Sequence, residues 1–319
     1  MKFNFVIVVF CSYQVIALHF SARRLRRNSS RLWDTRYTIN DSICPPTKSW
    51  LLNDIVSRNC NSIDTFLDRK PIASHTLAAF NEIRQYIDHS KEIVLDSGCG
   101  TGRSTRLLGI QHPDKQVVGI DRSFVRLSKA DALRENSLKN SPTAMKPTQE
   151  SRRPYHSVAS SNVVFVRAEL ADFWRCCVEE GWKISHHYLL YPNPYPTKAR
   201  IKQRWYAHPS FPLILKLGGD ITLRSNWEGY LHEFALSVLY ADEYWNAEQQ
   251  SRHCHPTDFN KNSAAPYRND AKLGPHERID KKVAWTNFEK KYDNVGETTY
   301  ELILRARSPE TGERILNPK

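Results

Sequence analysis

Two apolar segments joined through a glycine-rich turn place the strongest constraint on how this chain folds. The first segment begins the sequence VLDSGCGTGRST at 94–105, and the second begins VVGIDRS at 117–123. Every second residue of the turn is a glycine: Gly98, Gly100 and Gly102. Glycines let the backbone turn sharply and approach a ligand closely. Asp121 ends the second segment, 25 residues after Asp96, where an acid can accept hydrogen bonds from ribose hydroxyls.

The ligand expected at this turn is not a dinucleotide. Dinucleotide-binding loops follow the pattern G-x-G-x-x-G, whose last glycine opens a helix beneath a pyrophosphate. Here the spacing is G-x-G-x-G, and the acidic Asp96 stands just before it. A carboxylate suits a cationic ligand better than a pyrophosphate. The alternative is a glycine-rich turn that binds no ligand.

Hydrophobic periodicity predicts that strands and helices alternate along the chain. We expect strands at 92–96, 116–120, 163–166, 188–191, 220–224 and 299–307. We expect helices at 76–89, after Arg103, and at 124–138, 170–180, 209–216 and 228–244. This alternation predicts an α/β fold with a doubly wound, mainly parallel sheet and helices on both faces. Ligands of such a sheet bind beyond the carboxyl ends of its strands.

The segment boundaries follow composition. Residues 1–36 combine an interrupted apolar run with a stretch rich in Arg and Ser, which is typical of a signal followed by a transit-like leader. This pattern resembles the bipartite leader of plastid proteins; a mitochondrial or other organellar destination is the alternative. We expect an extension at 37–75, a main domain at 76–307 with insertions at 136–161 and 246–282, and a tail at 308–319. The apolar run is short and interrupted for a membrane span, and a membrane anchor is a further alternative for it. No stable membrane association is expected of the mature form.

Charge and cysteine content narrow the partners. The formal net charge is +12, and residues 1–40 supply +6 of it, so the remainder is also basic and fits an anionic partner such as nucleic acid. The seven cysteines include no C-x-x-C pair, and no His/Cys cluster has zinc spacing. We therefore predict free thiols and no metal. The sequence does not indicate an oligomeric state.

A proline-rich turn after the fourth predicted strand points to the substrate. The strand runs into YPNPYPTKARIKQRW, whose prolines restrict the backbone. Four basic residues follow: Lys198, Arg200, Lys202 and Arg204. Aromatic residues flank them, and the combination of base stacking with phosphate attraction is typical of nucleic-acid binding. A solvated basic face is the alternative interpretation.

These segments resemble known enzymes. The glycine turn and the second acid resemble the first two motifs of class I S-adenosylmethionine-dependent methyltransferases. YPNPYPTK at 191–198 resembles the P-D-P-W-x-K segment of bacterial-type tRNA (guanine-N7)-methyltransferases. LRSNWEGYLHEFALSVL at 223–239 resembles their T-D-W-x-x-Y motif and the following helix, and TNFEKKYDNVGETTYELILR at 286–305 resembles their T-x-F-E segment and final strand. The resemblance covers 76–307 apart from the insertions and implies a seven-stranded Rossmann-like methyltransferase sheet.

The resemblance also implies residue roles. The cofactor, S-adenosylmethionine, would contact Asp96, Gly98, Gly100, Gly102, Asp121 and Glu169. Asn193 takes the place of the acid of P-D-P-W and is the candidate catalytic residue. The tRNA would contact Lys198, Arg200, Lys202, Arg204, Asn226, Thr286 and Glu289. Thr197 replaces Lys198 under a different gap placement. The implied reaction is methylation of guanine N7 in tRNA, at the variable-loop guanine of position 46.

Two positions depart from the family pattern, because Asn193 and Asn226 are amides where the family usually carries carboxylates. An amide cannot act as a general base. Guanine N7 has an in-plane lone pair and no proton to remove, so its methylation needs mainly alignment, which can contribute about 7–11 kcal/mol. Two alternatives stay open: a non-catalytic RNA-binding protein on a methyltransferase scaffold, and a small-molecule methyltransferase.

Overall fold

The computed structural model describes residues 47–135, 156–252, 272–275 and 284–306. Their centre is an eight-stranded sheet with the strand order β3-β4-β2-β1-β5-β6-β8-β7. The predicted leader and tail lie outside the described residues, as do most of the two predicted insertions. Among the helices that the structure does describe, none is long and apolar enough to cross a membrane.

The strands, in chain order, are β1 (Ile93–Ser97), β2 (Gln116–Asp121), β3 (His156–Ser160), β4 (Val163–Arg167), β5 (Ile184–Leu190), β6 (Asp220–Ser225), β7 (Lys272–Pro275) and β8 (Tyr300–Leu304). The four ladders that join β4, β2, β1, β5 and β6 are parallel. The ladders of β3 with β4, β6 with β8 and β7 with β8 are antiparallel. The strand order changes direction at β1, so the carboxyl ends of β1, β2 and β5 meet at the switch point where such sheets bind ligands.

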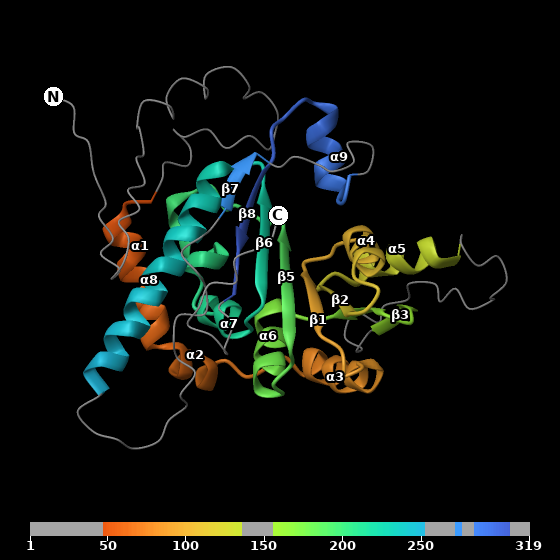
Figure 1. Cartoon of the computed structure of the whole chain (residues 1–319), viewed down its shortest axis with the longest axis horizontal. Helices are drawn as coiled ribbons and strands as arrows, with labels where there is room; N and C mark the ends of the chain where they lie inside the picture. The colour runs from red at the N-terminus through yellow and green to blue at the C-terminus, as the bar shows by residue number, and fades with distance from the viewer. Residues whose placement is uncertain (1–46, 136–155, 253–271, 276–283, 307–319) are drawn as a thin grey trace, which may run out of the picture. The chain divides into compact units, whose positions relative to one another are not determined.

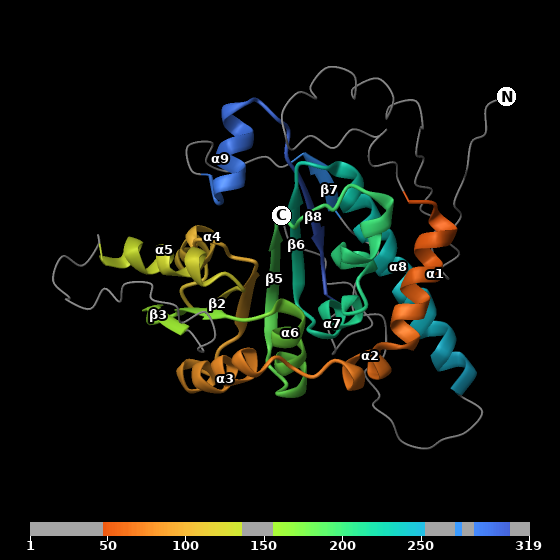
Figure 2. The ribbon, with the colours of Figure 1, turned by 180° about the vertical axis from the view of Figure 1, so that it is seen from behind.

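The helices are α1 (Ser49–Asn61), α2 (Ile63–Arg69), α3 (Ser74–Ile83), α4 (Arg103–Gln111), α5 (Phe124–Glu135), α6 (Leu170–Glu179), α7 (Phe211–Lys216), α8 (Glu228–Arg252) and α9 (Asn287–Asn294). The short 3₁₀ helices are η1 (Arg84–Tyr86), η2 (Lys198–Gln203) and η3 (Trp205–Ala207). In both views of the ribbon, α1 lies alongside α8, and α9 lies beyond the carboxyl ends of β5 and β6 (Figures 1 and 2).

Helices cover both faces of the sheet. Leu108 of α4 and Leu127 of α5 pack with Val94 and Val117 in one core cluster. The opposite face is covered by α6, because Trp174 donates from Nε1 to the hydroxyl of Ser97 at 3.0 Å. Successive side chains of a strand point to opposite faces, which explains why alternate residues of β1 meet different helices. The expected doubly wound arrangement with helices on both faces is confirmed.

Two edge strands, β3 and β7, lie in segments where no strand was expected. The segment at 136–161 was expected to be irregular, yet β3 pairs with β4 at its end, and β7 lies within the segment expected at 246–282. Both are short edge strands in polar sequence, which periodicity does not detect. The resemblance implied seven strands, and these are present with β3 added at the edge.

The fifth strand begins four residues earlier than the predicted 188–191, at Ile184. Its two histidines look polar in sequence, but His187 is fully buried and its Nε2 lies 2.8 Å from the Ser97 hydroxyl. Burial lowers the pKa of His187 to about 3, so this side chain is neutral inside the sheet and adds no buried charge.

The turn before β6 offers a matched test of packing. Gly218 and Gly219 both have a φ of +71°, which L side chains rarely adopt, but a Cβ on Gly218 would meet open space. A Cβ on Gly219 would lie 2.6 Å from the carbonyl oxygen of Ile184. We expect Gly218→Ala to lower the free energy of unfolding by about 1–2 kcal/mol through strain alone. Gly219→Ala should cost about 2 kcal/mol more, as measured by urea unfolding; equal losses would contradict this packing.

Candidate active site

The glycine turn adopts the conformation that its sequence predicts. Gly98, Gly100 and Gly102 have φ values of +83°, +60° and +72°, and a Cβ on Gly98 or Gly100 would meet no atom within 4 Å. The backbone amides of Gly98 and Cys99 both donate to the carbonyl of Ile120, at 2.7 and 2.9 Å. The turn is therefore fastened to the end of β2, with open space above two of its glycines.

Asp96 lies beneath the turn and is almost completely buried. Its Oδ2 accepts hydrogen bonds from the hydroxyls of Ser104 and Thr105, both at 2.6 Å. Its Oδ1 is buried and has no hydrogen-bond partner among the described residues. Burial raises the pKa of the Asp96 carboxyl to about 6, against the opposing effect of the two hydroxyls. An unpaired carboxylate oxygen at this position fits a cationic ligand group.

Asp121 stands on the other side of the turn, at the end of β2. Its Oδ2 accepts from the amide of Gly100 at 3.0 Å, and its Oδ1 accepts from the amide of Ser123 at 2.7 Å. Each carboxylate oxygen can accept a second hydrogen bond, so Asp121 can hold ribose hydroxyls while it orders the turn. The guanidinium of Arg126 lies 3.6 Å away.

The third predicted cofactor contact, Glu169, follows β4 at the same edge of the sheet. It is half-buried, precedes the first residue of α6, and its amide donates to the Thr76 hydroxyl at 3.0 Å. Glu169 thus lies one strand beyond Asp121 in the sheet order. Asp96 and Asp121 lie at the carboxyl ends of β1 and β2, and Glu169 follows β4, the next strand in the sheet. A row of acids at neighbouring strand ends suits a nucleoside that carries a sulfonium and an amine.

The proline turn after β5 is backbone-strained. Tyr191 and Tyr195 have φ values of 54° and 43° although neither is glycine, a conformation that is costly unless the surroundings impose it. Asn193 is exposed, and its Oδ1 accepts from the amide of Tyr195 at 3.2 Å. The candidate catalytic amide is therefore presented to solvent by a rigid turn.

The C-terminal segment that begins at Ala284 contacts the glycine turn. Arg103, the first residue of α4, donates from Nε to the carbonyl of Ala284 at 2.7 Å, and Asn287 donates to the hydroxyl of Thr101 at 3.4 Å. Thr286 caps α9, because its hydroxyl accepts from the amide of Glu289 at 3.0 Å. The glycine turn and the Thr286–Glu289 stretch therefore lie side by side.

Glu289 joins this segment to the proline turn. Its Oε1 accepts from the hydroxyl of Tyr191 at 3.2 Å and from Arg224 at 3.0 Å, and its Oε2 accepts from the amide of Trp285 at 2.6 Å. The side chain is fully buried. We expected Glu289 to contact the substrate, but the structure encloses its carboxylate among protein donors. It holds the segments of the site together instead.

The four basic residues predicted to contact tRNA differ in their exposure to solvent. Lys198, Arg200 and Lys202 are exposed on η2, as the sequence predicts for phosphate contacts. Arg204 is only 2% exposed and forms an ion pair with Glu233. A buried, paired guanidinium cannot meet a phosphate, so the prediction that Arg204 contacts tRNA is wrong. Sequence alone gave no signal of this, because Glu233 lies 29 residues away.

Asn226 has an acidic partner. It follows β6, is half-buried, and donates from Nδ2 to Oε1 of Glu297 at 2.9 Å. A negative charge therefore lies beside the amide where the resembling family usually has a carboxylate. Glu297 stands in the segment that resembles the family's final motif, but nothing in its sequence position predicts a pairing with Asn226.

Two aromatic residues of the site were not predicted. Trp285 lies under the guanidinium of Arg224, 4.2 Å from the ring centroid, and Phe288 is 47% exposed with its ring 6.3 Å from that of Tyr191. Trp285 directly precedes the TNFE stretch and Phe288 lies within it, so this motif was the available signal. An exposed aromatic beside this edge can stack on a base. No group of three or more His, Cys, Asp or Glu that could hold a metal occurs in the described part of the chain.

Comparisons with known proteins point to methyltransferases. The model of a family described as "Putative methyltransferase" matches residues 90–302. A tRNA (guanine-N(7)-)-methyltransferase of Acinetobacter baylyi is 26% identical over 162 residues, which are 50% of this chain and 56% of that protein. The chain thus spans little more than half the length of this relative.

Solved structures are more distant. A structure described as an antibiotic related methyltransferase is 16% identical, with a TM-score of 0.40 and coverage of 72% of this chain and 92% of the other. A 16S rRNA (adenine(1408)-N(1))-methyltransferase of Catenulisporales acidiphilia is also 16% identical, with a TM-score of 0.38 and coverage of 73% and 94%. At these scores the sheet order itself is the better guide to the fold.

The unpaired oxygen of Asp96 predicts a pH dependence. If the ionised carboxylate holds the donor, the raised pKa of about 6 makes donor affinity rise with pH through that value. We expect S-adenosylmethionine to bind about tenfold more tightly at pH 7 than at pH 5, measured by calorimetry, because the carboxyl is mostly protonated at the lower pH. The Asp96→Asn variant should bind weakly and lose this step. The same pH dependence in both proteins would contradict the assignment.

Proposed function

Because the chain belongs to this methyltransferase family, we propose that it transfers the methyl group of S-adenosylmethionine to guanine N7 in tRNA, at the variable-loop guanine of position 46. The proposal rests on the contact of three segments: the glycine turn, the proline turn and the C-terminal Thr286–Glu289 stretch. Glu289 accepts a hydrogen bond from Tyr191 at the start of the proline turn, and Asn287 donates one to Thr101 in the glycine turn. Donor and substrate segments therefore share one edge of the sheet, as a methyl transfer between two bound molecules requires.

The residues divide the work. S-adenosylmethionine supplies a methyl group that is already activated on sulfur. Asp96, Asp121 and Glu169 would hold the donor, while the exposed amide of Asn193 would orient the guanine by hydrogen bonding. The transfer breaks the carbon–sulfur bond and forms a carbon–nitrogen bond with the N7 lone pair, so no proton has to leave the purine and an amide suffices at position 193.

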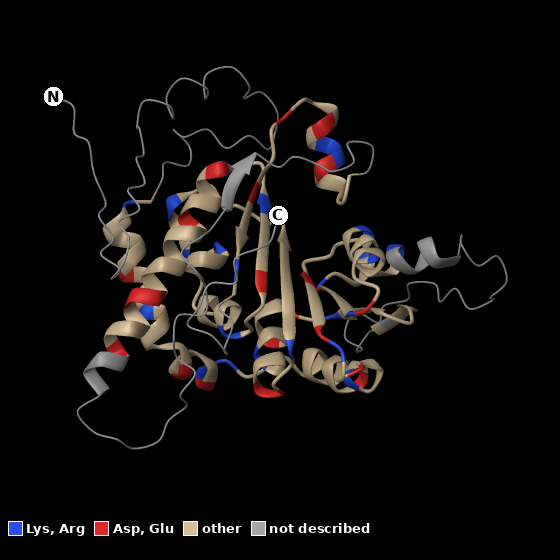
Figure 3. Ribbon diagram, viewed as in Figure 1, with Lys and Arg blue, Asp and Glu red and all other residues tan. Residues whose placement is uncertain are grey.

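The exposed cations favour tRNA over a small substrate. Lys and Arg are spread over the described elements rather than gathered on one of them (Figure 3). The place of Lys198, Arg200 and Lys202, immediately after the strained turn, therefore supports the assignment more than their number does. A small neutral substrate gives no reason for charge there, whereas a phosphate backbone does.

The activity can be tested directly. Purified protein with S-adenosylmethionine and unmodified tRNA should produce 7-methylguanine, detected by mass spectrometry of nuclease digests and mapped within the tRNA. Removing the charges of Lys198 and Arg200 by substitution with Gln should weaken tRNA binding about tenfold and lower its salt slope by about two. Donor affinity should not change.

The matched control removes two exposed lysines, Lys183 and Lys216, which precede β5 and β6 at the amino ends of the strands. This double Gln variant has the same net charge and should bind tRNA nearly as well as the wild type. A protein that binds tRNA but neither binds the donor nor forms 7-methylguanine would support the RNA-binding alternative.

The Asn226–Glu297 pair offers a second test. Asn226→Asp would place two carboxylates at a hydrogen-bond separation of 2.9 Å, so one of them must take up a proton or move away. We expect a loss of about 1–3 kcal/mol in the free energy of unfolding at pH 7 and a fall in methylation. The double variant Asn226→Asp, Glu297→Gln reverses donor and acceptor and should recover both quantities. No recovery would show that the charge must stand at position 297.

A further inference from the structure

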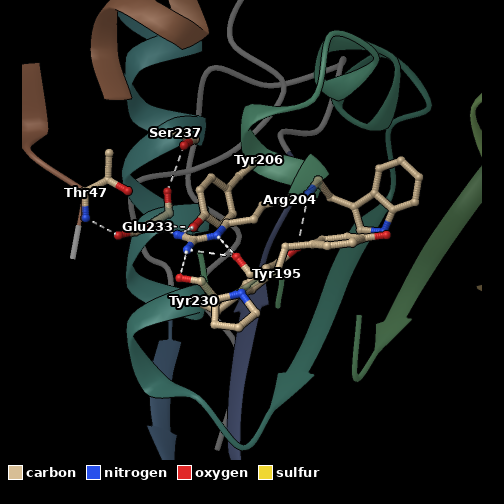
Figure 4. Close-up of polar contacts among 9 residues, drawn as sticks. Thr47, Tyr195, Arg204, Tyr206, Tyr230, Glu233 and Ser237 are labelled. Carbon is tan, nitrogen blue, oxygen red and sulfur yellow. Dashed lines mark hydrogen bonds and ion pairs between the residues drawn. The ribbon is translucent and has the colours of Figure 1, made fainter. Parts of the chain in front are cut away.

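Of the four basic residues predicted to contact tRNA, Arg204 is the buried one. Its N–H donors point toward the backbone of the proline turn. Its Nε and Nη2 donate to the carbonyl of Tyr195 at 3.2 and 3.1 Å, and Nη2 also reaches the carbonyl of Pro196 at 3.4 Å (Figure 4). These two residues follow the exposed Asn193. The guanidinium is therefore hydrogen-bonded to the backbone of the turn that carries Asn193, the candidate catalytic residue.

The other side of the guanidinium is fixed by α8. Nη1 of Arg204 donates to Oε2 of Glu233 at 3.1 Å and to the hydroxyl of Tyr206 at 2.8 Å. The Tyr206 hydroxyl also donates to the same Glu233 oxygen. The guanidinium also lies over the ring of Trp227, 4.9 Å from its centroid. Every part of the planar fork is thus engaged, which a lysine ammonium cannot reproduce.

Glu233 connects this unit to the N-terminal part of the chain. Its Oε1 accepts from the amide of Thr47 at 2.6 Å, and Asn59 of α1 donates to the carbonyls of Ala207 and His208 at 3.1 and 3.2 Å. Both N-terminal residues precede the span matched by the family model, 90–302. Residues outside that span therefore brace the segment that follows the basic cluster.

We propose that Arg204, held by Glu233, is a positioning residue that keeps the proline turn in its strained conformation and so aims Asn193 at the substrate. The φ of 43° at Tyr195 is unfavourable by itself, and its carbonyl receives two of the donors of Arg204. This inference rests on the proposed function, because the turn is taken to hold the methyl acceptor.

The principal test is Arg204→Lys, which keeps the charge but loses the fork. Amide hydrogen exchange of a peptide covering 189–203 should become at least tenfold faster, while exchange in the strands of the sheet stays within twofold. The kcat/KM for tRNA methylation should fall about 100-fold, since a misplacement of about 1 Å can cost that much. The affinity for S-adenosylmethionine should stay within twofold.

The matched control is Arg175→Lys. Arg175 also holds two backbone carbonyls, those of Leu67 and Lys70, and is paired with a glutamate, Glu179. The Arg175→Lys variant should leave tRNA methylation and amide exchange at 189–203 unchanged. Should Arg204→Lys fail to fold, Tyr206→Phe removes one partner of the guanidinium and is expected to show the same selective effect at smaller size.

A double-mutant cycle separates positioning from stability. If Arg204 acts through the turn, removing the Asn193 side chain should cost much less in the Arg204→Lys background than in the wild type. Three results would each overturn the inference. In Arg204→Lys, exchange could be faster uniformly across the sheet, or kcat/KM could equal that of the wild type although exchange at 189–203 is faster. In the cycle, the losses from Arg204→Lys and from removal of the Asn193 side chain could be additive. Because hydrogen exchange needs no turnover, an inactive wild type would refute the proposed function and leave this test standing.

Discussion

The arrangement of the site depends on one buried carboxylate. Glu289 accepts hydrogen bonds from Tyr191, which follows β5, from Arg224 of the neighbouring strand β6, and from Trp285 in its own segment. A carboxylate removed from water is costly unless it is paired and its oxygens are satisfied. The low-energy state of Glu289 therefore exists only when the proline turn, β6 and the C-terminal segment meet. The condition that satisfies this charge also assembles the site.

The parts of the fold that could be predicted are those written in local sequence. Gly98, Gly100 and Gly102 have positive φ because that turn needs a conformation open to glycine, and Asp121 lies at the end of β2 because the apolar run before it forms a strand. Buried strands and amphipathic helices follow from periodicity in the same way. For these elements the residue type and its spacing contain the physical reason for the structure.

What could not be predicted depends on partners far away in the chain. In sequence Arg204 resembles the surface cations beside it, and its burial depends on its ion pair with Glu233, on α8, together with the other partners that the fold supplies. Glu289 reads as a substrate contact until Arg224, 65 residues before it, is found beside it. The same holds for His187, which joins β5 because Ser97 lies opposite and burial keeps it neutral. Burial of a polar side chain is decided by tertiary pairing, which spacing does not report.

The amide of Asn226 is best understood from the negative charge that lies beside it. Methylation of guanine N7 creates a cation on the purine, and nearby carboxylates stabilise it. Asn226 carries no charge, but its Nδ2 donates to Glu297, so a carboxylate lies within a hydrogen bond of that position. We infer that, in the proposed reaction, Glu297 would supply the negative charge that Asn226 does not carry.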